Sequence, residues 1–128
     1  MSGRTWIAAG ALFGALAVAT GAFGAHALRE RFETSRQAEA YETAVRYQMY
    51  HALALVLVGL LALHTGGSIC LDIAGACFAG GIIIFSGMLY GWSLGGPSLL
   101  GAIVPIGGTA FIIGWVALAV AALRMAQK

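Results

Sequence analysis

The charged residues of this chain are concentrated in one short segment, and this concentration constrains the fold more than any other feature. Eight of the twelve charged residues lie within the eighteen positions from Arg29 to Arg46. Residues 6–25, 69–92 and 98–123 contain one charged side chain, Asp72, and residues 44–63 are apolar after their first two turns. A bilayer core is about 30 Å thick, and about 20 apolar helical residues span it. The sequence therefore predicts four membrane crossings.

The spacing of these stretches predicts an all-α, up-down bundle of four transmembrane helices, with an interfacial charged segment between the first two. We expect one domain over residues 1–128, with helices at residues 6–27, 35–63, 69–92 and 98–124. The other connections, residues 64–68 and 93–97, are short, so consecutive helices run antiparallel. With 60% hydrophobic residues and a net charge of +2, the composition leaves no room for a soluble domain and indicates no nucleic-acid partner.

The N-terminal stretch has some features of a signal peptide. Arg4 precedes an apolar run, and residues 25–27 resemble a small-residue cleavage site. The run of about 20 apolar residues is longer than the usual signal core of about 7–15 residues. We therefore expect it to remain in the protein as the first helix.

The second helix has a clear start signal. Thr34, followed by Gln37, fits a capping box, and neither glycine nor proline occurs from residue 35 to residue 58. One helix of about 30 residues is roughly 45 Å long, so its first turns should stand in the headgroup region. There Glu42 and Arg46 have the spacing of a favourable ion pair.

Polar residues at the other helix ends have ordinary structural explanations. Ser68 is expected to cap the third helix, with the carboxylate of Asp72 favoured in its positive first turn. His26 and His64 stand where the first two helices end, where a histidine suits the negative dipole. Cys70 and Cys77 are interpreted as small apolar packing residues, because no metal-ligand spacing surrounds them.

Small residues recur at helical spacing in three of the four expected spans. Such rows let helix backbones approach closely in lipid, either within one chain or between chains. The predicted packing positions are Gly10, Gly14, Ala17, Gly21 and Ala25 in the first helix, Gly87, Gly91 and Gly95 in the third, and Gly101, Gly107, Gly108 and Gly114 in the fourth.

Several polar residues are expected to share one depth, on the side of the charged segment. Gln48 and His51 continue a stripe that should face the bundle, Ser86 and Tyr90 come from the third helix, and Pro105 leaves the carbonyl of Gly101 without its helical donor. The candidate pocket or ligand-binding residues are His51, Gln48, Tyr47, Ser86, Tyr90, His26, Arg46 and Pro105.

Two interpretations of His51 follow. A neutral His51 can fasten helices by hydrogen bonds, or it can belong to a site that binds or moves a small molecule, a lipid or a proton. A bis-histidine haem is disfavoured, because His26 and His51 should differ in depth by about 10 Å. We expect no cofactor and no metal.

The motifs resemble those of the DUF423 family. The resemblance rests on residues 21–28 (GAFGAHAL), Tyr47-Gln48 with residues 51–55 (HALAL), residues 85–90 (FSGMLY), and residues 105–108 (PIGG) with Gly114-Trp115. This family includes small bacterial inner-membrane proteins and relatives of transmembrane protein 256. The resemblance implies four transmembrane helices and a bacterial inner-membrane location, and it implies no reaction.

The sequence alone therefore predicts a membrane protein of unknown biochemical activity. The leading interpretation is a non-enzymatic component that forms a homo-oligomer or associates with another membrane protein, in contact with membrane lipid. The alternative is a binding or transport module for a small molecule, lipid or proton around His51. A membrane enzyme is disfavoured, because no carboxylate pair or activated nucleophile can be placed within the spans.

Overall fold

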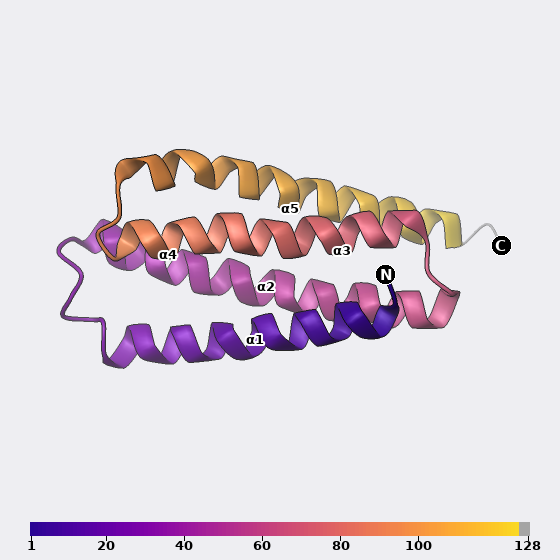
Figure 1. Ribbon diagram of the computed structural model, residues 1–128, viewed down its shortest axis with the longest axis horizontal. Helices are drawn as coiled ribbons and strands as arrows, with labels where there is room; N and C mark the ends of the chain where they lie inside the picture. Colours follow the sequence, from indigo (N-terminus) through magenta and orange to yellow (C-terminus); the bar gives the residue numbers. More distant parts are fainter. Residues whose placement is uncertain (126–128) are drawn as a thin grey trace.

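The structure, a computed structural model, describes residues 1–125 and contains four long helices laid side by side (Figure 1). They are α1 (Gly3–His26), α2 (Ser35–Thr65), a third helix made of α3 (Ile69–Gly81), a π-helical turn η1 (Ile82–Ser86) and α4 (Gly87–Ser93), and α5 (Ser98–Met125). Each is long and apolar enough to cross a membrane. The predicted all-α, up-down transmembrane bundle is confirmed.

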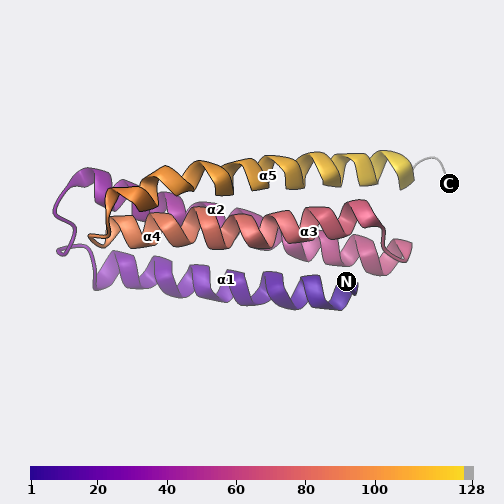
Figure 2. The ribbon, with the colours of Figure 1, turned by 45° about the horizontal axis from the view of Figure 1, so that its top comes forward.

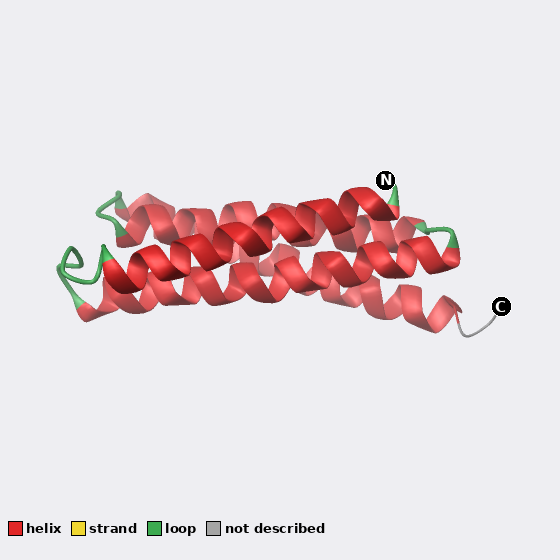
Figure 3. Ribbon diagram, turned by 90° about the horizontal axis from the view of Figure 1, so that it is seen from below, coloured by secondary structure: helices red, strands yellow, loops and turns green. Residues whose placement is uncertain are grey.

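The helices are arranged with α2 and the third helix in the middle. α1 packs mainly on α2 and α5 on the third helix, while α1 and α5 make no contact with each other in the described part of the chain (Figures 1 and 2). The α1–α2 and α4–α5 connections lie at one end of the bundle and the α2–α3 connection at the other (Figure 3). The inner helices are accordingly the more buried, and the outer two present most of their surface to lipid.

The charged segment leads into α2 through the predicted cap. The Thr34 hydroxyl accepts a hydrogen bond from the backbone N–H of Gln37, and the Gln37 side chain accepts one from the Thr34 N–H, at 3.3 and 3.1 Å. Arg46 and Glu42 form the expected exposed ion pair at 3.1 Å. Phe32 packs against the ring of Tyr41, with ring centroids 5.4 Å apart, so this part of the connection folds back onto the bundle.

A seam of small residues lets α1 lie directly on α2. Its buried members recur every seven residues: Gly3, Gly10, Ala17 and Gly24. A methyl group at Gly10 would lie 2.6 Å from the carbonyl oxygen of Ala52, and one at Gly59 would lie 2.5 Å from the carbonyl oxygen of Gly3. The backbones therefore touch, and a seven-residue repeat is the spacing that favours a left-handed supercoil.

The same repeat joins α5 to the third helix. Gly107, Gly114 and Ala121 are the buried small residues of α5, again seven apart. A methyl group at Gly107 would collide with the backbone of Phe85, and one at Gly114 would lie 2.6 Å from the Phe78 ring. These glycines act within one chain.

Other glycines that were predicted to pack helices make no close contact between helices within this chain. Gly95 lies outside the helix, with a positive φ of 96° in the α4–α5 turn, so it does not extend the row of the third helix. Gly87 has no atom within 4 Å of a built Cβ, and Gly14 has only the Ala52 methyl at 4.0 Å. The spacing predicted Gly14 and Gly87 as contact positions, but within this chain they are open.

The π-helical turn was not expected from the sequence. Buried positions on the third helix are seven apart before the turn, at Leu71 and Phe78, and seven apart after it, at Ser86 and Ser93. Ser86 follows Phe78 by eight positions in place of seven, so the turn adds one residue to the repeat. A π turn absorbs one such residue without breaking the helix. It thereby turns Ser86 toward α2.

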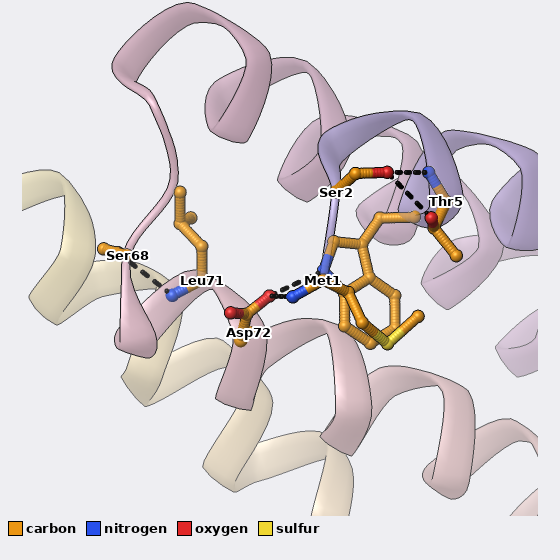
Figure 4. A network of polar contacts seen from close by, with 7 residues as sticks. Met1, Ser2, Thr5, Ser68, Leu71 and Asp72 are labelled. Atoms are coloured by element: carbon orange, nitrogen blue, oxygen red, sulfur yellow. Dashed lines mark hydrogen bonds and ion pairs between the residues drawn. The ribbon is translucent and has the colours of Figure 1, made fainter.

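Asp72 ties the beginnings of α1 and α3 together (Figure 4). Ser68 caps α3 by accepting a hydrogen bond from the Leu71 N–H at 3.3 Å, as predicted. Asp72 lies in the first turn, and its Oδ1 accepts hydrogen bonds from the Trp6 indole at 3.1 Å and the Met1 amine at 2.7 Å. The carboxylate thus makes a contact between helices in addition to its place at the helix start.

We predict that Gly10→Ala destabilises the bundle and that Gly14→Ala does not. The methyl group at Gly10 meets immovable backbone and should lower the free energy of unfolding by about 1–3 kcal/mol. At Gly14 the site is open, so the substitution should be neutral or stabilise by up to about 1 kcal/mol. Reversible unfolding in mixed micelles measures both. Equal losses would contradict the assignment of the seam.

Candidate functional site

One face of α2 carries two of the buried polar residues of the bundle, Gln48 and His51. Seven of its ten buried positions follow alternating steps of three and four residues: Tyr41, Ala44, Gln48, His51, Leu55, Val58 and Ala62. This is the pattern of a helix facing the centre of a left-handed bundle. Because α2 is an inner helix, its polar side chains reach both neighbours.

Gln48 joins α2 to two other helices. Its amide nitrogen donates to the carbonyl oxygen of Phe13 in α1 at 2.9 Å, and its amide oxygen accepts from the Tyr90 hydroxyl of α4 at 2.7 Å. Tyr90 in turn lies 3.0 Å from the Thr20 hydroxyl of α1. Tyr41 donates to the carbonyl of Thr20 at 2.6 Å. One connected network therefore fastens α1, α2 and α4.

Ser86 makes a second link between the inner helices. Its hydroxyl is 1% exposed and donates to the carbonyl oxygen of Ala44 at 2.7 Å. Ser86 is the last residue of the π-helical turn, and its place on the inner face follows from the extra residue in that turn. The hydrogen bond between Ser86 and Ala44 and the π-helical turn therefore depend on each other.

His51 is held in a single protonation state by its two partners. Its Nδ1 lies 2.7 Å from the carbonyl oxygen of Tyr47, and its Nε2 accepts from the Trp115 indole N–H of α5 at 3.1 Å. A carbonyl only accepts and an indole N–H only donates, so the ring is neutral with its proton on Nδ1. Phe111 stacks on the ring with centroids 3.5 Å apart. His51 is thus the link from α2 to α5.

An aromatic groove opens between α2 and α5 beside His51. Its volume is about 710 Å³, and its lining residues are Tyr47, Tyr50, His51, Phe85, Pro105, Gly108, Thr109, Phe111, Ile112 and Trp115. α2 and α5 touch at few other points. Tyr47, Tyr50 and Trp115 are 40%, 55% and 45% exposed.

The residues predicted to share one pocket separate into different places. Gln48, Ser86 and Tyr90 lie in the interior network, whereas His51, Tyr47 and Pro105 border the groove. The remaining two lie elsewhere: His26 is exposed at the end of α1, and Arg46 lines a crevice between α1 and α2.

Sequence reasoning missed part of the polar layer that surrounds Gln48, His51, Ser86 and Tyr90. Side chains of the layer form hydrogen bonds with the backbone carbonyl oxygens of Phe13, Thr20, Ala44 and Tyr47. Within residues 1–125, the carbonyl oxygen of Gly101 accepts no hydrogen bond from a side chain of the layer. Thr20 and Trp115 were not expected in the layer. Thr20 could have been found, because it is a lone hydroxyl in an apolar span. Trp115 could not, because a tryptophan in a membrane helix fits the membrane interface equally well.

Every buried polar side-chain atom in the described residues has a hydrogen-bond partner. His, Cys, Asp and Glu side chains form no group of three that suits a metal ion within residues 1–125. Cys70 and Cys77 are both free thiols, and Cys70 lies 3.5 Å from a nitrogen of Arg124. The polar layer is therefore a set of completed links between helices.

Known proteins match this chain over most of its length. Residues 20–108 match the family described as "Protein of unknown function (DUF423)". The chain is 45% identical to a UPF0382 membrane protein of Staphylococcus epidermidis, covering 96% of this chain and 98% of the relative. It is 43% identical to UPF0382 membrane protein YwdK of Bacillus subtilis, covering 94% and 98%. No solved structure matches the chain.

We predict that Gln48 and Tyr90 are energetically coupled. In a double-mutant cycle with Gln48→Leu and Tyr90→Phe, the interaction energy should be about 0.6 kcal/mol or more, since hydrogen bonds between membrane helices average about 0.6 and reach about 1.7 kcal/mol. The control cycle pairs Gln48→Leu with Thr65→Val, which removes a hydroxyl bonded only to Leu61 at the far end of α2. That pair should show no coupling. Equal values in both cycles would show that the network does not join the helices.

Proposed function

The chain belongs to the DUF423 family, as its motifs predicted, and from that premise we propose that it is a non-enzymatic component of the bacterial inner membrane that acts by associating with further membrane helices. The protein is an integral membrane protein, and its relatives carry the description of membrane proteins without an activity. The first association to test is between two copies of this chain.

The completed hydrogen bonds of the interior support a non-enzymatic role. General acid–base or nucleophilic catalysis needs a side chain that can meet a substrate, and His51 already has partners on both ring nitrogens. Ser86, Gln48 and Tyr90 are likewise occupied by other helices. The alternative of a binding or transport module around His51 would have to break these links first.

The aromatic groove is the observation that carries the proposal of association. Along α5 it extends from Pro105 to Trp115, about 15 Å at 1.5 Å per residue. Gly108 lines it without a side chain, so another backbone can approach closely there. Exposed tyrosine and tryptophan rings offer contact area that costs little conformational entropy when covered. These features fit a helix at membrane depth.

A second copy is the occupant that symmetry favours. Two copies inserted in the same orientation are related by a two-fold axis along the membrane normal, which places the same surface of each against the other. α5 supplies one wall of the groove, where Ile112 is 66% exposed, and also Ile106, which lies outside the lining and is 61% exposed. A two-fold contact would therefore bring α5 of one copy into the groove of the other.

We predict that single cysteines in the groove form disulfide-linked dimers in native membranes. In a background of Cys70→Ala and Cys77→Ala, the Ile112→Cys variant should be linked between copies by a mild oxidant. The control is Leu12→Cys on α1, where the native side chain is 67% exposed against 66% for Ile112. It should stay monomeric. Linking at both positions, or at neither, would count against the groove as the contact.

Two adjacent glycines provide a second prediction. Gly108→Leu should leave the fold intact, because a built Cβ lies 3.8 Å from the Phe85 ring, and it should abolish dimer linking by filling the groove. Gly107→Leu should lower the free energy of unfolding by about 3 kcal/mol or more, because it collides with the Phe85 backbone. Linking is assayed with Ile112→Cys, and stability by reversible unfolding. A Gly108→Leu variant that is folded and still dimeric would refute the proposal.

A further inference from the structure

A crevice of about 530 Å³ lies between the end of α1 and the first turns of α2, and none of its lining residues lines the aromatic groove. Part of its lining is small and apolar, with Gly21, Ala25 and Val45. The other part is charged, with Arg29, Glu42 and Arg46. Its volume falls in the range of about 300–1,000 Å³ that ligand sites occupy. It joins an apolar slot to an ionic one, as an amphiphile requires.

The two arginines of the crevice have N–H donors that make no hydrogen bond within the described residues. Arg46 donates one hydrogen bond to Glu42 at 3.1 Å, and a guanidinium carries five N–H donors. The guanidinium of Arg29 makes no hydrogen bond or ion pair with any residue from 1 to 125. The lining therefore carries a net charge of +1, from two arginines and one glutamate. A monoanionic phosphate diester complements that charge.

The depth of the crevice matches a lipid headgroup. Val45 lies against Gly21, where a built methyl would be 3.2 Å away, so Arg46 stands at about the level of Gly21. Gly21 precedes the end of α1 by five residues, about 7.5 Å along the helix. A long arginine side chain near the end of a membrane helix can extend to the phosphate layer.

We infer that this crevice binds one anionic phospholipid, with its phosphate between Arg29 and Arg46 and an acyl chain in the slot beside Gly21 and Ala25. Arginine presents paired donors that suit phosphate oxygens, and a side chain is absent at Gly21 where the lipid chain would lie. The inference does not rest on self-association, because the crevice and the aromatic groove share no residue.

Native mass spectrometry of the whole protein, released from vesicles of known composition, tests the inference. The probes are dioleoyl phosphatidylglycerol and dioleoyl phosphatidylcholine. The wild type should retain one phosphatidylglycerol per chain and about tenfold less phosphatidylcholine. Equal retention of both lipids, or displacement of the lipid by millimolar inorganic phosphate, would overturn the inference, because either result means that the crevice does not recognise an anionic lipid as a whole.

Matched variants test the charged part of the crevice. Arg29→Gln and Arg46→Gln should each lower retention about tenfold, whereas Arg31→Gln, in the same segment but outside the lining, should not. Glu42→Gln breaks the Arg46 ion pair and keeps the arginine, so retention should not fall. A loss with Arg31→Gln equal to that with Arg29→Gln would overturn the inference, since the segment's charge alone would then explain binding.

The slot is tested by two glycines seven residues apart on α1. Gly21→Leu should fill the crevice and lower retention about tenfold, whereas Gly14→Leu, on the same face and outside the lining, should not. Unchanged retention in Gly21→Leu would exclude the slot. Circular dichroism confirms the fold of each variant, and if Arg46→Gln is misfolded, Arg29→Gln in the connection decides alone. Disulfide linking through Ile112→Cys should be the same in all of them, which separates failure here from failure of self-association.

Discussion

The bundle depends on the requirement that polar groups inside a bilayer find partners within the protein. α2 meets this requirement at the centre of the bundle, because its inner face carries Gln48 and His51 and is itself flanked by helices on both sides. Hydrogen bonds from this face reach α1 through Phe13, α4 through Tyr90 and α5 through Trp115. Apolar packing alone does not favour one arrangement of helices strongly in lipid, since lipid tails are as apolar as leucine. The directed bonds therefore select the arrangement.

The small-residue seams make those bonds geometrically possible. Gln48 reaches the Phe13 carbonyl because Gly10 and Ala17 bring α1 into backbone contact with α2. On the other side, Gly107 and Gly114 let α5 approach the third helix closely. The seven-residue spacing of both seams keeps each pair in contact over the membrane thickness. Close approach and hydrogen bonding thus reinforce each other along the bundle.

The π-helical turn reconciles two demands on the third helix. Its first part must present Leu71 and Phe78 to the core, and its last part must present Ser86 and Tyr90 to α2 and α1. A regular helix with a seven-residue repeat would place residue 85 in the position that Ser86 occupies. The extra residue in the turn corrects this offset, at the cost of less regular backbone hydrogen bonds. The aromatic groove lies between α2 and α5, beside His51.

Much of the fold could be predicted because the bilayer leaves few choices. Long apolar stretches require helices, short connections require antiparallel neighbours, and Thr34 with Gln37 marks where α2 begins. The inward stripe of α2 followed from its spacing. Glycine spacing also indicated close packing, but several glycines lie on more than one candidate row. Gly10 could pair with Gly14 four residues on or with Ala17 seven residues on, and only the position of α2 decides between them.

The sequence by itself determined the number of spans, their order and the inner face of α2, since these depend on hydrophobic length and local periodicity. The tertiary structure decided which polar side chains meet. Thr20 and Trp115 join the layer because their helices lie beside α2, and Arg46 is separated from His51 because it points to another gap between helices. A hydrogen bond depends on distances of tenths of an ångström between residues far apart in the chain. Such distances are set by how whole helices cross, and no local pattern records them.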